Sequence, residues 1–142
     1  MTYIKDITQK IIDLLKADVN LSEPDKIAKY YFGIPKKVEY YPIIYVQFNG
    51  RDYTGKADIN RFLYSLKYEI GIVDRQVSED DAEKSVYDKI EQIECVLDAN
   101  PTLDNLVIKE LEPREIRVLR AVEEDYAIAW AQIFASWRKW LP

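Results

Sequence analysis

One stretch of this 142-residue sequence comes close to a phosphate-binding loop. Residues 50–57 read Gly-Arg-Asp-Tyr-Thr-Gly-Lys-Ala, near the pattern of two glycines followed by Lys and Ser or Thr. Ala57 has no hydroxyl for Mg²⁺, and the residues after it favour a strand rather than a helix N-terminus facing a phosphate. The sequence therefore does not favour nucleotide binding here.

Clustered carboxylates are the next candidates for chemistry, because the chain has no His to act as an acid or base. They occur at Glu79-Asp80-Asp81 and at Glu123-Glu124-Asp125. The first set opens a predicted helix, where the helix dipole favours negative charge, and the second lies in a predicted turn between strands. A structural role is the simpler interpretation of both. A hydrolase using Glu123 or Asp125 is the alternative, and it requires a carboxyl pair in a cleft with one raised pKa.

The single cysteine, Cys95, offers neither an internal disulfide nor a thiolate metal site. It follows Ile93 and precedes Val96 on a predicted helix, so we expect a buried thiol that acts as a small hydrophobe. A lone cysteine also agrees with a reducing compartment such as a cytoplasm. We predict no catalytic residue, no cofactor and no metal ligand, and therefore no enzyme.

Aromatic residues are abundant, with 11 Tyr and 3 Trp. The C-terminal run Trp137-Arg138-Lys139-Trp140 could stack on single-stranded nucleic acid, which favours rings beside cations. A net charge of −5 opposes phosphate binding, and we expect no sequence-specific nucleic acid binding. Trp137 and Trp140 either cap the edge of the core or contact a neighbouring subunit.

Length and composition favour one folded domain spanning residues 1–142. The chain is 48% hydrophobic and 32% charged, and its apolar runs are too short for a membrane span. A signal peptide needs an uninterrupted apolar segment. Lys5 and Asp6 interrupt such a segment here, so we expect no signal peptide. The acidic excess lies mostly between Glu79 and Asp125, where we expect solvated surface, or else a surface that repels nucleic acid or contacts a basic partner.

The hydrophobic pattern predicts two helices and several strands. The spacing of Ile and Leu predicts an amphipathic helix over about 3–17, and the cap Ser78 opens the main helix over about 78–98. The cap-like run at 22–25 predicts a short helical piece toward Tyr31. Strict alternation from Phe62 to Ile72 places aromatic and aliphatic side chains on one face of a strand. Further strands are predicted at 43–48, 106–110, 115–122 and 127–139.

This order of elements indicates an α+β fold, a mostly antiparallel sheet with helices packed on one face. Small alanines in the last strand suggest that another layer packs closely there. Between the strands at 43–48 and 62–72, residues 49–61 are predicted to form a long projecting loop, and such loops often carry function. The predicted interface residues are Arg51, Asp52, Tyr53 and Lys56 in this loop, together with Trp137 and Trp140.

Two stretches resemble a known family. The main helix contains Glu-Lys-Ser-Val-Tyr-Asp-Lys-Ile at 83–90, and the chain continues at 96–107 with Val-Leu-Asp-Ala-Asn-Pro-Thr-Leu-Asp-Asn-Leu-Val. With the Pro-Ile-Ile-Tyr-Val strand at 42–46 and the strand ending Glu-Ile-Gly-Ile-Val at 69–73, the sequence resembles tail terminator and tail-completion proteins of long-tailed phages and related prophages. The stretch 21–41 has no counterpart that we can place in that family.

The resemblance implies a structural virion protein that assembles into a homo-oligomeric ring, commonly a hexamer, in the host cytoplasm. Such a ring caps the finished tail tube in the virion and joins it to the head–tail connector protein. The tail tube protein, the connector protein and further copies of the chain would be its partners, with no membrane involved. The acidic residues would then suit a lumen through which DNA passes. A cytoplasmic α+β binding module for a peptide or small ligand is the alternative, and a defined concave pocket in a stable monomer would favour it.

Overall fold

The computed structural model describes residues 3–22, 27–56 and 60–142. Helices predicted over 3–17 and 78–98 are confirmed, with small shifts at their ends. In chain order the elements are α1 (Tyr3–Ala17), α2 (Val19–Ser22), β1 (Lys29–Phe32), β2 (Ile43–Lys56), β3 (Phe62–Gln76), α3 (Glu79–Ala99), β4 (Lys109–Glu123) and β5 (Tyr126–Leu141).

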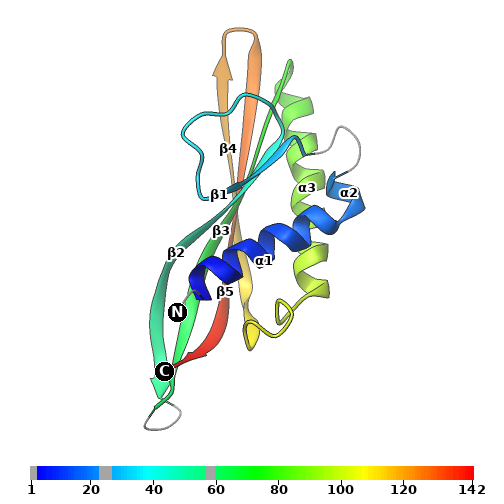
Figure 1. The fold of residues 1–142 in the computed structure, drawn as a ribbon. Helices are drawn as coiled ribbons and strands as arrows, with labels where there is room; N and C mark the ends of the chain where they lie inside the picture. The colour runs from blue at the N-terminus through cyan, green and yellow to red at the C-terminus, as the bar shows by residue number, and fades with distance from the viewer. Residues whose placement is uncertain (1–2, 23–26, 57–59) are drawn as a thin grey trace.

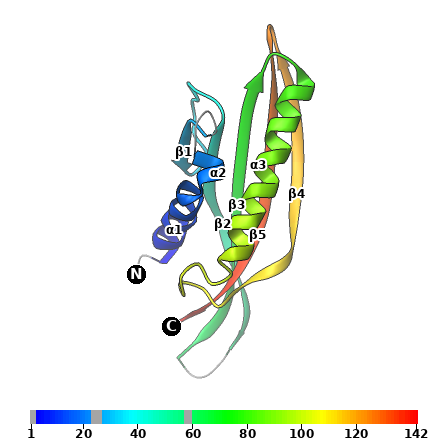
Figure 2. The same cartoon turned by 90° about the vertical axis from the view of Figure 1, so that its right-hand side faces the viewer.

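The described strands form one five-stranded sheet in the order β1-β2-β3-β5-β4. Only the short edge strand β1 runs parallel to its neighbour, and the other pairs are antiparallel. Helices α1 and α3 cover the same face of the sheet, as Figure 2 shows, and none of the described helices lies on the other face. The predicted α+β fold is therefore confirmed.

The core lies between the sheet and the two long helices. The strand face predicted from alternation at 62–72 points into it, with Leu66, Tyr68 and Ile70 almost fully buried. The small residues of β5, Ala129, Ala131 and Ala135, are buried in the same core, on the strand against which α3 packs. This confirms that alanines mark a close approach of a second layer.

Helix α3 begins as its sequence indicates, because the Oγ of Ser78 accepts a hydrogen bond from the Asp81 amide at 3.1 Å. An ionic cluster then ties α3 to edge strand β4. The guanidinium of Arg114, whose side chain is 7% exposed, bonds carboxylates on both elements, those of Glu94, Asp98 and Glu110. The hydrogen bond from Arg114 to Glu110 is the largest cause of a raised pKa for the guanidinium, which stays charged.

The prediction of a long loop over 49–61 is wrong. Strand β2 continues to Lys56 and pairs with β3 down to the register Lys56↔Phe62, while residues 57–59 lie outside the described part of the chain. Two β-bulges, at Phe48/Gly50 and Tyr53/Gly55, interrupt the alternation of β2 and hide it from a pattern search. The two glycines and the charged residues between them gave the stretch the composition of a loop.

Three further predictions need correction. The helical piece predicted toward Tyr31 is strand β1 at its C-terminal end, and residues 23–25 of the predicted cap lie outside the described residues. The strands predicted at 106–110 and 115–122 are one strand, β4, because a register shift between Leu111 and Glu115 accommodates the break around Pro113. Cys95 is exposed rather than buried, because it lies on the solvent side of α3 between buried Ile93 and Val96.

The irregularities of β2 and β4 fall on one level of the sheet. One row of paired residues crosses β2, β3, β5 and β4 at Gly50, Lys67, Ser136 and Leu111. The register shift after Phe48 in β2 and the register shift after Leu111 in β4 both occur next to this row. Bulges bend strands and increase their twist. Past this row, β2, β3 and β5 extend beyond the helices as a narrow projection, seen at the bottom of Figures 1 and 2.

Candidate functional site

The projection carries most of the residues that the sequence singled out for an interface. We call it the arm and define it as residues 51–56 of β2, 61–67 at the start of β3 and 137–141 of β5. The pairing of β2 with β3 and of β3 with β5 holds it together. Of the predicted residues, Arg51, Asp52, Tyr53, Lys56 and Trp140 have exposed side chains on the arm, and Trp137 does not.

Aromatic rings contact one another on the helix side of the arm. The ring of Tyr53 lies 6.0 Å from that of Tyr64, edge-on, and 6.1 Å from that of Phe62. Tyr53 is nevertheless 58% exposed, since none of the described helices extends over this part of the sheet (Figure 2). The arm therefore presents the ring of Tyr53 to solvent, while half-buried Tyr64 beneath it packs against the core.

Cations lie over the rings of this surface. The guanidinium of Arg51 is 4.4 Å from the centre of the Tyr64 ring and donates a 2.7 Å hydrogen bond to the hydroxyl of Tyr3 at the start of α1. The ammonium of Lys56 is 6.0 Å from the centre of the Phe62 ring. Such cation–π contacts hold a charged group in place while leaving it available to a partner.

The opposite side of the arm is built in the same way. Trp140, 38% exposed, pairs with Leu63 in the register and lies under the guanidinium of Arg61 at 5.6 Å. Asp52 alternates to this side and forms an ion pair with Lys67. The predicted residues are thus divided between two sides, with Arg51, Tyr53 and Lys56 on one and Asp52 and Trp140 on the other.

Trp137 belongs to the core and not to the surface of the chain. Its side chain is 1% exposed and packs edge-on against Tyr68 at 5.8 Å. The sequence left two interpretations open for the tryptophans, the edge of the core or contact with a neighbouring subunit. Trp137 lies in the core, and Trp140 is exposed. Tyr64 is half-buried and packs against the core, as the alternation predicts. Sequence reasoning missed exposed Arg61, which precedes β3 and shows no signal of its own until its contact with Trp140 is seen.

The helix-free face of the sheet holds a second constellation, centred on Glu69. This carboxylate is 5% exposed and accepts hydrogen bonds from the Tyr45 hydroxyl, from Gln132 Nε2 at 3.0 Å and from Asn49 Nδ2 at 3.4 Å. Trp130 Nε1 donates to the Tyr45 oxygen at 3.0 Å. Burial, followed by the hydrogen bond to Glu69, raises the pKa of Tyr45 above its usual range, so the phenol stays neutral and keeps donating.

Three hollows open beside these residues. An apolar one of about 170 Å³ lies under the segment that joins β1 to β2 and is lined by Ile34, Pro35, Val38, Ile43, Tyr45, Val73 and Trp130. A polar hollow of about 330 Å³ lies at the bulges, between Asn49 and Glu115. Another, of about 350 Å³, lies between Lys29, Lys37 and Tyr40. In shape and lining, only the first of these three resembles a site for an apolar ligand.

The clustered carboxylates at 79–81 and 123–125 are exposed, at the start of α3 and at the β4–β5 turn. Within the described ranges, no three acidic or thiol side chains gather into a group that could hold a metal ion. None of the helices in those ranges is long and apolar enough to span a membrane.

Comparison with known proteins finds solved structures of similar fold. No protein-family model matches the chain, and no curated protein matches it. A chain in a solved structure of the virion of a native gene transfer agent (GTA) particle is similar in fold, with a TM-score of 0.40 and 11% sequence identity over 90% of both chains. A likeness at this level carries no functional argument.

Proposed function

We propose that this chain is a structural virion protein of the tail-terminator type, with no enzymatic role. Copies of it form a ring, a hexamer in the proteins that the sequence resembles, on the end of a phage tail tube. The ring joins the tube to the head–tail connector, so the partners are other copies of the chain, the tube protein and the connector protein. The protein resides in the tail of the virion after assembly in the host cytoplasm.

The arm is the observation that carries this proposal. Interfaces are enriched in Tyr, Trp and Arg, and the arm exposes all three away from the helices that cover the rest of the core face. A closed ring requires two different surfaces on each subunit that fit each other. A rigid projection from the subunit body is suited to reach a neighbour or the rim of a tube.

The order of elements supports the same proposal. The resemblance rests on an N-terminal helix, a strand from Pro42, a strand ending at Val73, a main helix and the turn that follows it. In the structure these are α1, β2, β3, α3 and the turn at 100–108, where Leu103, Asp104 and Asn105 have left-handed backbone angles.

Shortening the arm tests the proposal. Replacing residues 53–64 by Asn-Gly would close the hairpin at the pair Asp52↔Ser65 with a favourable two-residue turn. A milder variant, R51A/Y53A/K56A, removes the exposed side chains of one side only. We expect both proteins to keep the circular dichroism of the folded chain, and phage assembled with either of them to yield separate heads and tails in electron micrographs.

The matched control for this experiment is Glu91→Ala, which removes an exposed side chain in the middle of α3. It should support normal joining of heads to tails. If phage assembled with the arm-shortened protein formed normally joined particles, the arm would have no role in joining heads to tails.

The apolar hollow near Trp130 favours a second function, binding of a small ligand. Ligand pockets have volumes of roughly 300–1,000 Å³, and the hollow, at about 170 Å³, is smaller. A saturable change in Trp130 fluorescence with a small aromatic compound, lost in a Val38→Asp variant, would support this function. Because the hollow is small for a ligand pocket, the assembly function is the better supported of the two.

A further inference from the structure

The end of the molecule opposite to the arm carries a hollow lined by both apolar side chains and carboxylates. We call it the acidic end and define it as residues 77–81, where β3 joins α3, and 122–126, where β4 turns into β5. All six charged side chains in these two stretches are acidic and exposed. Between them lie Val77, 80% exposed, Val122, 69% exposed, and Tyr126, and a hollow of about 190 Å³ opens at this point.

The arm has the reverse character. Its described residues carry one acidic side chain, Asp52, which is paired with Lys67. The remaining charged side chains are basic, and three of them lie over aromatic rings: those of Arg51, Lys56 and Arg61. The arm thus combines aromatic rings with cations, and the acidic end combines apolar side chains with anions.

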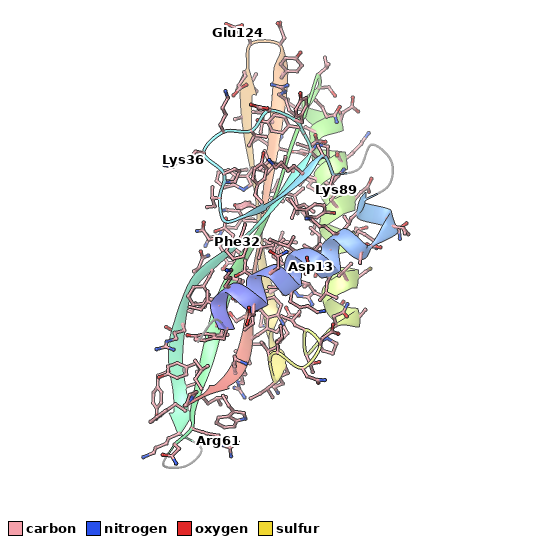
Figure 3. The ribbon with its side chains drawn as sticks, viewed as in Figure 1. Asp13, Phe32, Lys36, Arg61, Lys89 and Glu124 are labelled. Carbon is pink, nitrogen blue, oxygen red and sulfur yellow. The ribbon has the colours of Figure 1, made fainter. Side chains whose placement is uncertain are left out.

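These two surfaces cannot meet within one copy of the chain. Figure 3 places Arg61 at one end of the molecule and Glu124 at the other. The 15 residues of β3 run between them, a distance of roughly 45–50 Å at about 3.3 Å per residue. Any contact between the two surfaces therefore joins different copies.

We infer that the arm of one copy docks onto the acidic end of the next copy. The inference rests on the proposed function, in which the arm is an assembly surface, and adds which surface receives it. Opposite charges steer such an encounter and fix its register, while the rings and the valines supply the apolar area. Because the two surfaces differ, the contact is heterologous and can be repeated around a ring.

Nucleic acid is the other partner that a cationic aromatic surface could bind. Two observations favour a second copy of the chain. Carboxylates occupy the far end of every subunit around exposed Val77 and Val122, a surface that repels phosphates and is opposite in charge to the arm. The chain as a whole carries a net charge of −5, which opposes attraction to phosphates.

Charge reversal on each surface tests the inference. One variant, K56E/R61E, makes the arm acidic, and another, E123K/E124K, makes the receiving end basic. Sedimentation velocity would follow self-association from about 1 to about 500 µM protein at about 0.05 and about 0.5 M salt, where screening differs strongly. We expect wild-type association to weaken with salt, and each variant alone to associate at least about tenfold more weakly than the wild type at low salt.

The decisive sample is an equimolar mixture of the two variants. The normal arm of E123K/E124K fits the normal acidic end of K56E/R61E, and the two reversed surfaces fit each other. We expect the mixture to recover association to within about threefold of the wild type, a recovery that misfolded proteins would not give. Single reversals elsewhere, K5E on α1 and E91K on α3, are the matched controls and should leave association unchanged.

The remaining outcomes separate this inference from the proposed function. Association that both variants retain, or that the mixture fails to recover, would overturn the pairing of these two surfaces while leaving a ring formed through others. A wild-type protein that stays monomeric at low salt would also overturn it, and joining of heads to tails would still decide the proposed function. Tight binding of a single-stranded oligonucleotide, lost only in K56E/R61E and without self-association, would identify nucleic acid as the partner instead.

Discussion

Replacing Gly71 with alanine is expected to destabilise the protein, because a Cβ at this position would lie 1.6 Å from a carbon of the Tyr45 ring. Gly71 pairs with Tyr45 in the register of β2 and β3, and the phenol ring lies across the glycine. The ring is 1% exposed and is fixed at its hydroxyl by Glu69 and Trp130. It cannot move aside without breaking these hydrogen bonds.

The magnitude follows from this geometry. Carbon atoms in contact are separated by about 3.5–4.0 Å, so the ring would have to move by about 2 Å. Overpacking of a core costs about 1–3 kcal/mol, and buried polar groups that lose a partner cost about 1–3 kcal/mol. We expect a loss of about 3–4 kcal/mol of unfolding free energy, out of a total of about 5–15 kcal/mol for a domain. The midpoint of thermal unfolding should fall by roughly 10 °C.

Urea unfolding followed by tryptophan fluorescence measures this loss. Gly55→Ala is the matched control, since a Cβ there meets nothing within 4 Å and its backbone is not left-handed. It should be neutral or stabilise the chain by up to about 1 kcal/mol. In the double variant Gly71→Ala/Tyr45→Leu the losses should be clearly less than additive, because the ring that clashes is gone. An unfolding free energy for Gly71→Ala within about 0.5 kcal/mol of the wild type would refute the argument.

Three further predictions concern the ionic cluster, the tryptophans and the tyrosines. Arg114→Ala should cost about 3–5 kcal/mol in urea unfolding, because it leaves the buried carboxylate of Glu110 without its cation, whereas Arg117→Ala, at an ion pair exposed by about 60%, should cost less than about 1 kcal/mol. Trp137→Ala should cost about 3–5 kcal/mol, and Trp140→Ala should leave most of the stability intact while reducing self-association; equal losses for the two would contradict their placement. Burial raises the pKa of Tyr68 to about 12, above its ordinary value of 10.0. The unfolded chain therefore ionises first, and stability that is complete below pH 10 is lost as the pH rises toward 12; Tyr68→Phe should reduce this loss in unfolding curves measured across that range.

Local signals in the sequence were sufficient to predict the helices α1 and α3 and the core face of β3. A capping serine, a 3.6-residue period and an uninterrupted alternation are properties of consecutive residues, so they can be recognised without knowing the partners. The order of the strands could not be obtained in this way, since β5 lies between β3 and β4 through contacts between residues far apart in the chain. The buried alanines of β5 indicated a close second layer but not which strands flank them.

Strand β2 shows why the rest could not be predicted. Each bulge adds one residue to the strand, so the side chains before and after Gly50 no longer share one alternation. A search for period two therefore ends near Phe48, and the remaining residues have the composition of a loop. The pairing of Tyr53 with Tyr64, which places both rings on the arm, becomes visible only when β3 is laid beside β2.

The difference between a loop and a paired arm also changes the energetics of assembly. The same residues, Arg51, Tyr53 and Lys56, would lose their conformational freedom on binding if they lay in a loop, at about 1–2 kcal/mol per backbone residue. In the arm, the ladder to β3 has fixed the backbone, and contacts with Tyr64 and Phe62 have fixed the side chains, before any partner arrives. Pre-organisation of this kind leaves more of the contact energy for binding. An exposed surface that folding has already ordered is therefore what an assembly protein needs, and the two bulges that concealed the strand help to shape it.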